Sequence, residues 1–140
     1  MVAKYKSFEE LSVGVTASIK RKVTAEDVRA YAEVTGDMNP MHLDDDYARK
    51  TVFGGRIAHG MYLGGLISSV LAQKLPGTGY AYLSQTLEFL RPVRIGDTVT
   101  VEVELLEKIE DEKKLRFKTI CRNQDGKIVV QGEATGKAIL

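Results

Sequence analysis

The stretch Gly60–Lys74, with the sequence GMYLGGLISSVLAQK, decides the fold. Its apolar residues recur at helical spacing over a broad surface, and the residues among them are small glycines and serines. A helix that is this apolar is buried rather than half-exposed. The apolar run is too short, and too often interrupted, to span a bilayer. We therefore predict one buried helix over Gly60–Lys74, with Pro76 and Gly77 ending the connection after it.

Strand patterns dominate the chain beyond this helix. They are clearest over Thr98–Lys108, where valine and leucine alternate with threonine and glutamate in the two-residue period of a strand. The pair Asp125-Gly126 predicts a two-residue hairpin turn of the primed type before the last strand. We expect an α+β architecture in which one curved antiparallel sheet wraps around the buried helix. The five predicted strands are Val15–Val23, Tyr80–Phe89, Thr98–Lys108, Leu115–Cys121 and Ile128–Ile139.

A second helix and an irregular segment separate the first strand from the buried helix. Ala25–Thr35 carries apolar residues at helical spacing, with Thr24 as the predicted N-cap and Gly36 as the stop. The residues from Asp37 to Ala58 have little regular pattern, apart from a short predicted helix over Asp45–Lys50. An irregular segment of this length in a compact domain is usually functional or disordered, and its apolar side chains argue against disorder.

Length, composition and charge indicate one small globular domain that spans residues 1–140. Twenty basic residues against nineteen acidic ones give a net charge of +1, so bulk electrostatics do not predict a nucleic-acid partner. Residues Met1 to Lys6 lack the apolar core of a signal peptide. The single cysteine, Cys121, cannot form an internal disulfide and is expected to be inert. We expect a cytoplasmic protein that does not enter a membrane.

Reactive side chains gather where the irregular segment begins. The run TGDMNPMHLD, residues 35–44, places a carboxylate, an amide and an imidazole within six positions. Gly36 lets the chain leave the helix sharply, and Pro40 restricts the backbone around it. The resulting stiff turn presents Asp37 and His42 from a fixed backbone. General acid–base catalysis needs two such groups within hydrogen-bond reach of one water, so Asp37 and His42 are the predicted acid–base pair.

The same run resembles the motif of the MaoC-like (R)-specific enoyl-CoA hydratases, also called hydratase 2, which have the hotdog fold. It departs from the family pattern only at Met41, where another aliphatic residue is usual. The resemblance continues through AHGM at 58–61 and YLSQTLEFLRPVRIGD at 82–97, and it covers nearly the whole chain from about Val15 onward. It implies a single hotdog domain, and a hydro-lyase that hydrates trans-2-enoyl-CoA to (R)-3-hydroxyacyl-CoA in fatty acid metabolism or polyhydroxyalkanoate precursor supply.

The resemblance also implies roles for individual residues. Asp37 and His42 hold and activate the water, and which of them is the base stays open. Asn39 supports this pair. The backbone N–H of Gly60 binds the thioester carbonyl, which is reasonable on its own because the N-terminus of a helix attracts developing negative charge. Ser68 occupies the place of a serine that hydrogen-bonds the active-site turn in family members.

Other polar residues have less specific interpretations. Arg91 and Arg94 are candidates for binding the coenzyme A phosphates, although solvated surface charge is the commoner role of such residues. His59 is expected to be structural, as a capping or packing residue. Two histidines and one distant cysteine argue against a metal site, and the only expected coenzyme is the coenzyme A of the substrate. Exposed sheet edges and the family resemblance both predict a homodimer or higher homo-oligomer.

Several functions stay open beside the hydratase. One is an acyl thioesterase of the same fold, which would also polarise a thioester carbonyl but has no need of the Asp–Asn–Pro–His turn. Another is a dehydratase whose 3-hydroxyacyl substrate is carried by acyl carrier protein. A non-catalytic acyl-CoA-binding module is the third. Acyl chain length, the thioester carrier and the pathway cannot be read from the sequence.

Overall fold

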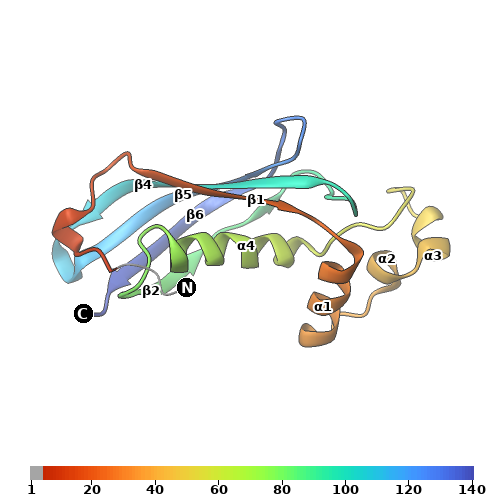
Figure 1. Cartoon of the computed structure of the whole chain (residues 1–140), viewed down its shortest axis with the longest axis horizontal. Coiled ribbons are helices and arrows are strands. Elements are labelled where there is room, and N and C mark those ends of the chain that lie inside the picture. Colours follow the sequence, from red (N-terminus) through yellow and green to blue (C-terminus); the bar gives the residue numbers. More distant parts are fainter. Residues whose placement is uncertain (1–4) are drawn as a thin grey trace.

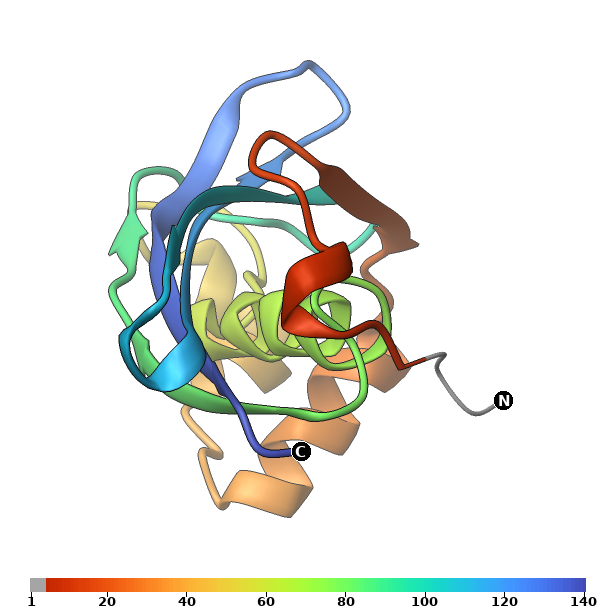
Figure 2. The same ribbon diagram turned by 90° about the vertical axis from the view of Figure 1, so that its left-hand side faces the viewer.

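One apolar helix, α4, lies along the concave face of an antiparallel sheet, and three shorter helices gather beyond its N-terminal end (Figure 1). Viewed from the end, the sheet curves around α4 (Figure 2). The computed structural model describes residues 5–140. Its helices are α1 Ala25–Thr35, α2 Pro40–Leu43, α3 Asp45–Arg49 and α4 Gly60–Gln73, with 3-10 turns at Phe8–Glu10 and Asp111–Lys113. Its strands are β1 Thr16–Lys22, β2 Tyr80–Gln85, β3 Glu88–Phe89, β4 Thr98–Ile109, β5 Lys114–Arg122 and β6 Ile128–Ala138.

The sheet has six strands rather than the five expected. Its order is β1-β4-β5-β6-β2, and β3 also pairs with β6. The predicted strand Tyr80–Phe89 is therefore divided in two, because Thr86 interrupts the ladder. The Thr86 N–H donates to the Glu133 carbonyl at 2.9 Å, while the Glu133 N–H donates to the Thr86 hydroxyl, also at 2.9 Å, instead of to a backbone carbonyl. A register shift between Tyr82 and Ser84 also interrupts the pairing of β2 with β6.

The core lies between the sheet and one face of α4. The alternation predicted for β4 is confirmed, since its inward side chains have no solvent exposure: Val99, Val101, Val103 and Leu105. They pack in one cluster with the buried residues of α4, which are Leu63, Ile67, Val70 and Leu71. Burying each such side chain contributes roughly 1.5–3 kcal/mol. The opposite face of α4 carries an exposed stripe of Met61, Gly65, Ser69 and Ala72, so the helix is less completely buried than predicted.

The segment between β1 and α4 is more regular than expected. Helix α1 has the predicted bounds, the predicted Thr24 cap on the Asp27 N–H, and Gly36 in the left-handed conformation at its end. Helix α3 also forms where a short helix was predicted. Helix α2 was not predicted. Asn39 starts it by accepting a hydrogen bond from the Met41 N–H at 3.1 Å, and Pro40 follows in the first turn, where proline is well tolerated.

The turn between β5 and β6 is a hairpin, as predicted, but the predicted turn type is wrong. A two-residue primed turn of the Asn-Gly or Asp-Gly kind needs positive φ at both central residues, and here only Gly126 has it, at 76°. The Asn123 side chain accepts from the N–H groups of Asp125 and Lys127 at 3.0 and 3.1 Å, which favours a longer turn. In the described part of the chain, none of the helices combines the length and the apolar character needed to cross a bilayer.

Gly132 in β6 allows a close approach between strands that a side chain would prevent. A Cβ at this position would lie 1.8 Å from the Thr86 carbonyl oxygen, so the backbone itself would have to move. We expect Gly132→Ala to lower the free energy of unfolding by about 1–3 kcal/mol, the usual cost of overpacking. Urea unfolding followed by circular dichroism measures this. The control is Gly55→Ala, whose Cβ would meet only the flexible Arg94 side chain at 3.7 Å. Equal stability of the two variants would contradict the role given to Gly132.

Candidate active site

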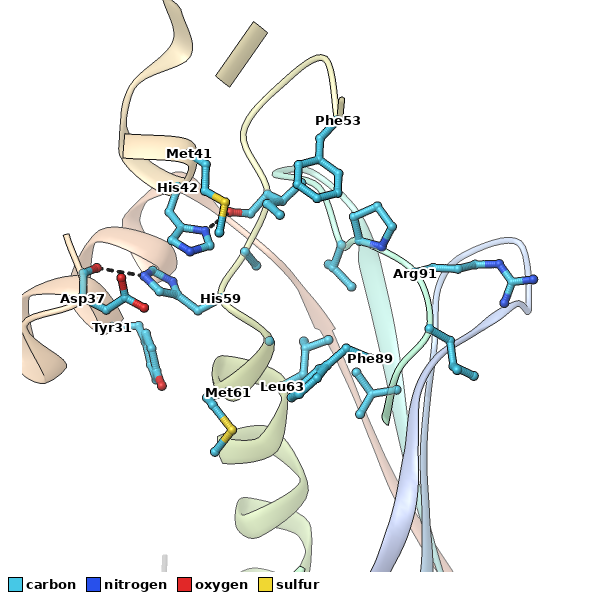
Figure 3. A pocket seen from close by; sticks show the side chains of 17 residues that line it. Tyr31, Asp37, Met41, His42, Phe53, His59, Met61, Leu63, Phe89 and Arg91 are labelled. Atoms are coloured by element: carbon cyan, nitrogen blue, oxygen red, sulfur yellow. Dashed lines mark hydrogen bonds between the residues drawn. The ribbon is translucent and has the colours of Figure 1, made fainter. Parts of the chain in front are cut away.

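The candidate site is a cavity of about 550 Å³ at the N-terminal end of α4. Figure 3 shows that side chains from α1, from the segment before α4 and from the strand side converge on it. Both members of the predicted acid–base pair, Asp37 and His42, line this cavity together with Gly60. The structure therefore brings together the three residues to which the main chemical roles were assigned. Other lining residues include Tyr31, Met41, His59, Phe89 and Arg91.

Asp37 lies in the exposed connection between α1 and α2. Its carboxylate accepts a hydrogen bond from the Asn39 N–H, and its own N–H donates to the Thr35 hydroxyl, both at 3.3 Å. Its main-chain carbonyl accepts a hydrogen bond from His59 Nε2 at 3.0 Å. Asn39 contacts both members of the pair. Its N–H binds the Asp37 carboxylate, and its side chain caps α2, the helix that carries His42.

His42 is buried in α2, with 4% of its surface exposed. Its Nδ1 lies 2.7 Å from the main-chain carbonyl of Ile57. A carbonyl oxygen can only accept a hydrogen bond, so the ring proton of the neutral imidazole sits on Nδ1 and Nε2 keeps its lone pair. The main chain of His42 is held as well, because Arg56 Nε donates to its carbonyl at 2.7 Å. Arg56 was not singled out from the sequence.

Burial sets the protonation state of His42. Loss of solvent around the ring lowers its pKa below the usual 6.5, and the nearby His59 lowers it further. The hydrogen bond to Ile57 and the charge of Asp37 act in the opposite direction, but they do not reverse the shift. His42 is therefore mainly neutral at pH 7, with a free Nε2 that can accept a proton.

His59 packs within the site instead of capping its helix. It occupies the N-cap position of α4, but its side chain makes no capping hydrogen bond, so that part of the prediction is wrong. Its ring stacks on His42 with centroids 3.8 Å apart, and Tyr31 lies against it at 4.6 Å. Packing, the other predicted role, is confirmed. Its Nε2 faces the Asp37 carbonyl, and its buried Nδ1 has no hydrogen-bond partner within residues 5–140.

The two histidines meet at one place, which the sequence argument against a metal did not foresee. Asp37, His42 and His59 each offer one possible ligand atom, and these atoms lie within 4.8 Å of one another. Each ring has one nitrogen at a main-chain carbonyl, which fixes its tautomer and leaves its other nitrogen without a proton. We interpret the three side chains as an acid–base cluster, and the absence of a metal stays a prediction.

Gly60 is the first residue of α4, so its N–H belongs to the first turn, where amides have no carbonyl partner inside the helix. The ring of Phe89 in β3 covers it closely. A Cβ at position 60 would lie 2.6 Å from a carbon of that ring, which only glycine permits without displacement. The sequence predicts Phe89 as the last residue of the strand Tyr80–Phe89. No sequence pattern indicates that its ring reaches the start of α4.

The remaining predicted residues divide between the cavity and other places. Arg91 lines the cavity, and its guanidinium donates to the Ile128 carbonyl at 2.8 Å. Arg94 is not among the lining residues, and its N–H donates to the Asp97 carboxylate at 2.9 Å. Ser68, about two turns beyond the start of α4, lines a second cavity of about 130 Å³. Within one chain Ser68 is therefore separate from the acid–base cluster, and its supporting role stays a prediction.

The fold and the cavity together define a class of protein. The MaoC-like domain family matches residues 9–125 of the chain. The chain therefore belongs to the MaoC-like domain family, and its curved sheet around one central helix is the hotdog fold.

Individual relatives narrow the comparison. The chain is 49% identical over 130 residues to the 3-hydroxybutyryl-CoA dehydratase of Methylorubrum extorquens, across 93% of this chain and 82% of the relative. It is 44% identical over 128 residues to the (R)-specific enoyl-CoA hydratase of Rhodospirillum rubrum, across 91% and 88%. Unliganded R-hydratase PhaJ1 from Pseudomonas aeruginosa is a similar solved structure, with a TM-score of 0.90 and 48% identity over 94% of this chain and 84% of that chain.

The protonation of His42 can be measured directly, because the chain has only two histidines. We expect the imidazole of His42 to titrate with a midpoint below 6.5 in a proton NMR experiment on tag-free protein. Since the pKa is lower in the folded than in the unfolded chain, the contribution of His42 to stability is complete above 6.5 and is lost as the pH falls through the lowered value. The His42→Gln variant assigns the signal, and a midpoint above 6.5 would contradict the burial argument.

Proposed function

We propose that this protein is an (R)-specific enoyl-CoA hydratase, a hydro-lyase that converts trans-2-enoyl-CoA and water reversibly into (R)-3-hydroxyacyl-CoA. The observation that carries the proposal is the free Nε2 of His42, next to the Asp37 carboxylate in a cavity that also contains the start of α4. The relatives support it, because two proteins more than 40% identical to this chain are named for this hydration and for the reverse dehydration. Coenzyme A enters as part of the substrate, and no other cofactor is proposed.

The geometry suggests how the reaction proceeds. A water bound between Asp37 and His42 gives a proton to His42 Nε2 while its oxygen attacks C3 of the enoyl group. The electron pair of the C2–C3 double bond moves toward C1, and negative charge develops on the thioester oxygen. The Gly60 N–H and the dipole of α4 stabilise that oxygen. Asp37 stabilises the imidazolium electrostatically, and the proton on His42 then passes to C2. The net change is the addition of H and OH, and the cluster returns to its starting state.

We further propose that one residue of the pair, His42, is the base. The sequence left Asp37 and His42 equivalent in this respect. The hydrogen bond from His42 to the Ile57 carbonyl leaves Nε2 as the only acceptor on that ring, and the lowered pKa keeps it unprotonated near neutral pH. We therefore assign His42 as the base in the hydration direction and Asp37 as the group that orients water and balances charge.

Mixing the purified protein with crotonyl-CoA tests the proposal. Loss of the conjugated thioester absorbance, with the (R) enantiomer found by chiral analysis, is the expected result. Release of free thiol would instead indicate a thioesterase. We expect Asp37→Ala and His42→Ala each to lower kcat by at least roughly 100-fold, because each removes one member of the acid–base pair. Circular dichroism checks that each variant is folded. Near wild-type turnover in both folded variants would refute the mechanism.

The role of the Gly60 amide predicts a second kinetic effect. We expect Gly60→Val to lower kcat severely, by roughly 100-fold or more, because a thioester oxygen kept away from the amide loses as much as when one oxyanion donor is absent. The added side chain would collide with Phe89 and obstruct the approach of the thioester. Gly55→Val is the matched control, because the new Cβ there meets only a flexible side chain at 3.7 Å. A folded Gly60→Val enzyme with unchanged kinetics would mean that the carbonyl is bound elsewhere.

We also propose a homodimer in the cytoplasm. The stripe on α4, formed by Met61, Gly65, Ser69 and Ala72, is exposed within one chain, and the edge strand β2 carries exposed apolar residues such as Leu83. A second copy of the chain could cover both surfaces. The two sites would then lie near the interface. Full activity from a monomer, measured by light scattering at micromolar concentration, would overturn the dimer.

A further inference from the structure

We propose that His59 is a positioning residue of the reaction, which holds both the Asp37 backbone and the His42 imidazole in their working geometry. The inference rests on the proposed hydration, because it takes Asp37 and His42 as the reacting pair. It concerns a residue whose sequence neighbourhood predicted only a helix cap or a packing role. The structure assigns His59 two separate contacts, one to each member of the pair.

The first contact fixes Asp37. The connection that carries Asp37 is exposed, and the two other hydrogen bonds of this residue are long, at 3.3 Å each. The bond from His59 Nε2 to the Asp37 carbonyl is shorter, at 3.0 Å, and it comes from a side chain that is only 3% exposed (Figure 3). It therefore ties a solvent-exposed turn to the rigid start of α4. Without it, the Asp37 carboxylate would lose the anchor that sets its distance from His42.

The second contact fixes the direction of the His42 lone pair. The two imidazoles stack with a centroid separation of 3.8 Å and an angle of 27° between their planes. On the His59 side the stack continues to Tyr31 of α1 at 4.6 Å, and Tyr31 meets Tyr62 of α4 edge-on at 6.1 Å. The stack links α1, α2 and the start of α4. Rotation of the His42 ring would break this packing as well as its bond to the Ile57 carbonyl.

Because the His42 and His59 rings are close, the charge of His59 changes the pKa of His42. Three groups that can carry charge lie around the His42 ring and backbone: Asp37 from the connection after α1, His59 from the start of α4, and Arg56, which binds the His42 carbonyl. Tyr31 of α1 lies against the far partner, His59. Among these, His59 lowers the pKa of His42 and Asp37 raises it. A side chain at position 59 that only filled space would have no such electrostatic effect.

Two substitutions separate the contacts. His59→Phe keeps a ring of similar size for stacking but removes the donor to Asp37. His59→Gln keeps a donor near the position of Nε2 but removes the ring. We expect each variant to lower kcat by about 10- to 100-fold, the effect of misplacing reacting groups by about an ångström. KM should stay within about threefold of wild type, because His59 orients the pair and not the acyl chain.

The control variant is Val52→Ala, which lies in the same segment and is 96% exposed. It should retain wild-type kcat and KM. Thermal melting of all variants separates loss of positioning from loss of the fold. If His59→Phe does not fold, His59→Gln still tests the inference, because glutamine places a polar group where histidine already has one.

An NMR titration supplies a readout that does not depend on activity. In either His59 variant His42 is the only histidine left, and its midpoint should rise relative to wild type because a charge-coupled neighbour is gone. A fall in kcat with KM retained and a raised His42 midpoint supports the inference. It is overturned if folded variants keep kcat within about twofold of wild type. It is equally overturned if kcat falls only together with melting temperature while the His42 midpoint does not move.

The two proposals can fail separately. If the wild-type protein does not hydrate crotonyl-CoA or longer trans-2-enoyl-CoA esters, the proposed function is wrong. The His42 midpoints of wild type and the two His59 variants then still report whether His59 controls the state of that ring. If wild type is active and the His59 variants match it in kcat and in the His42 midpoint, only the positioning role is wrong.

Discussion

The burial of α4 against the sheet is the constraint on which the rest of the structure depends. Its apolar side chains have no stable place except the concave face of the strands, so the position of its axis is fixed by the core. The start of the helix is fixed with it. His59 and Gly60 are the last residue before α4 and its first residue, so the core indirectly sets the place of one wall of the cavity. The irregular segment then has only to bring Asp37 and His42 to that wall.

Main-chain groups, more than side chains, orient the residues of this site. The Ile57 carbonyl fixes the tautomer of His42, and the Asp37 carbonyl accepts a hydrogen bond from His59. The role proposed for Gly60 also uses a main-chain group, its first-turn amide. Such groups are present whatever side chain the position carries. Burial of the His42 ring lowers its pKa, and the hydrogen bond to the Ile57 carbonyl acts in the opposite direction without reversing the shift.

Sequence patterns predicted the features that depend on local or periodic signals. Helix α1 appears with the predicted bounds because Thr24 and Gly36 mark its ends, and β4 shows the predicted alternation because one of its faces is buried. Asp37 and His42 were identified because they lie within six consecutive positions that include a proline. Features that depend on contacts between distant segments were missed. The break between β2 and β3 comes from the Thr86 hydroxyl binding the β6 backbone. His59 and Arg56 reach the site only because the segment folds back on α2.

Two backbone carbonyls accept hydrogen bonds from the imidazole rings. This affects which positions of the sequence can change during evolution without loss of the acid–base cluster. A ring tautomer that is set by a neighbouring carboxylate or amide is lost when that neighbour mutates. Here the acceptor for His42 belongs to Ile57 and the acceptor for His59 belongs to Asp37, and a carbonyl oxygen is present whatever side chain the position carries. Substitution at position 57 can alter the apolar wall of the cavity without altering which ring nitrogen of each histidine carries the proton. Substrate preference and acid–base chemistry can therefore evolve as nearly independent traits on this scaffold.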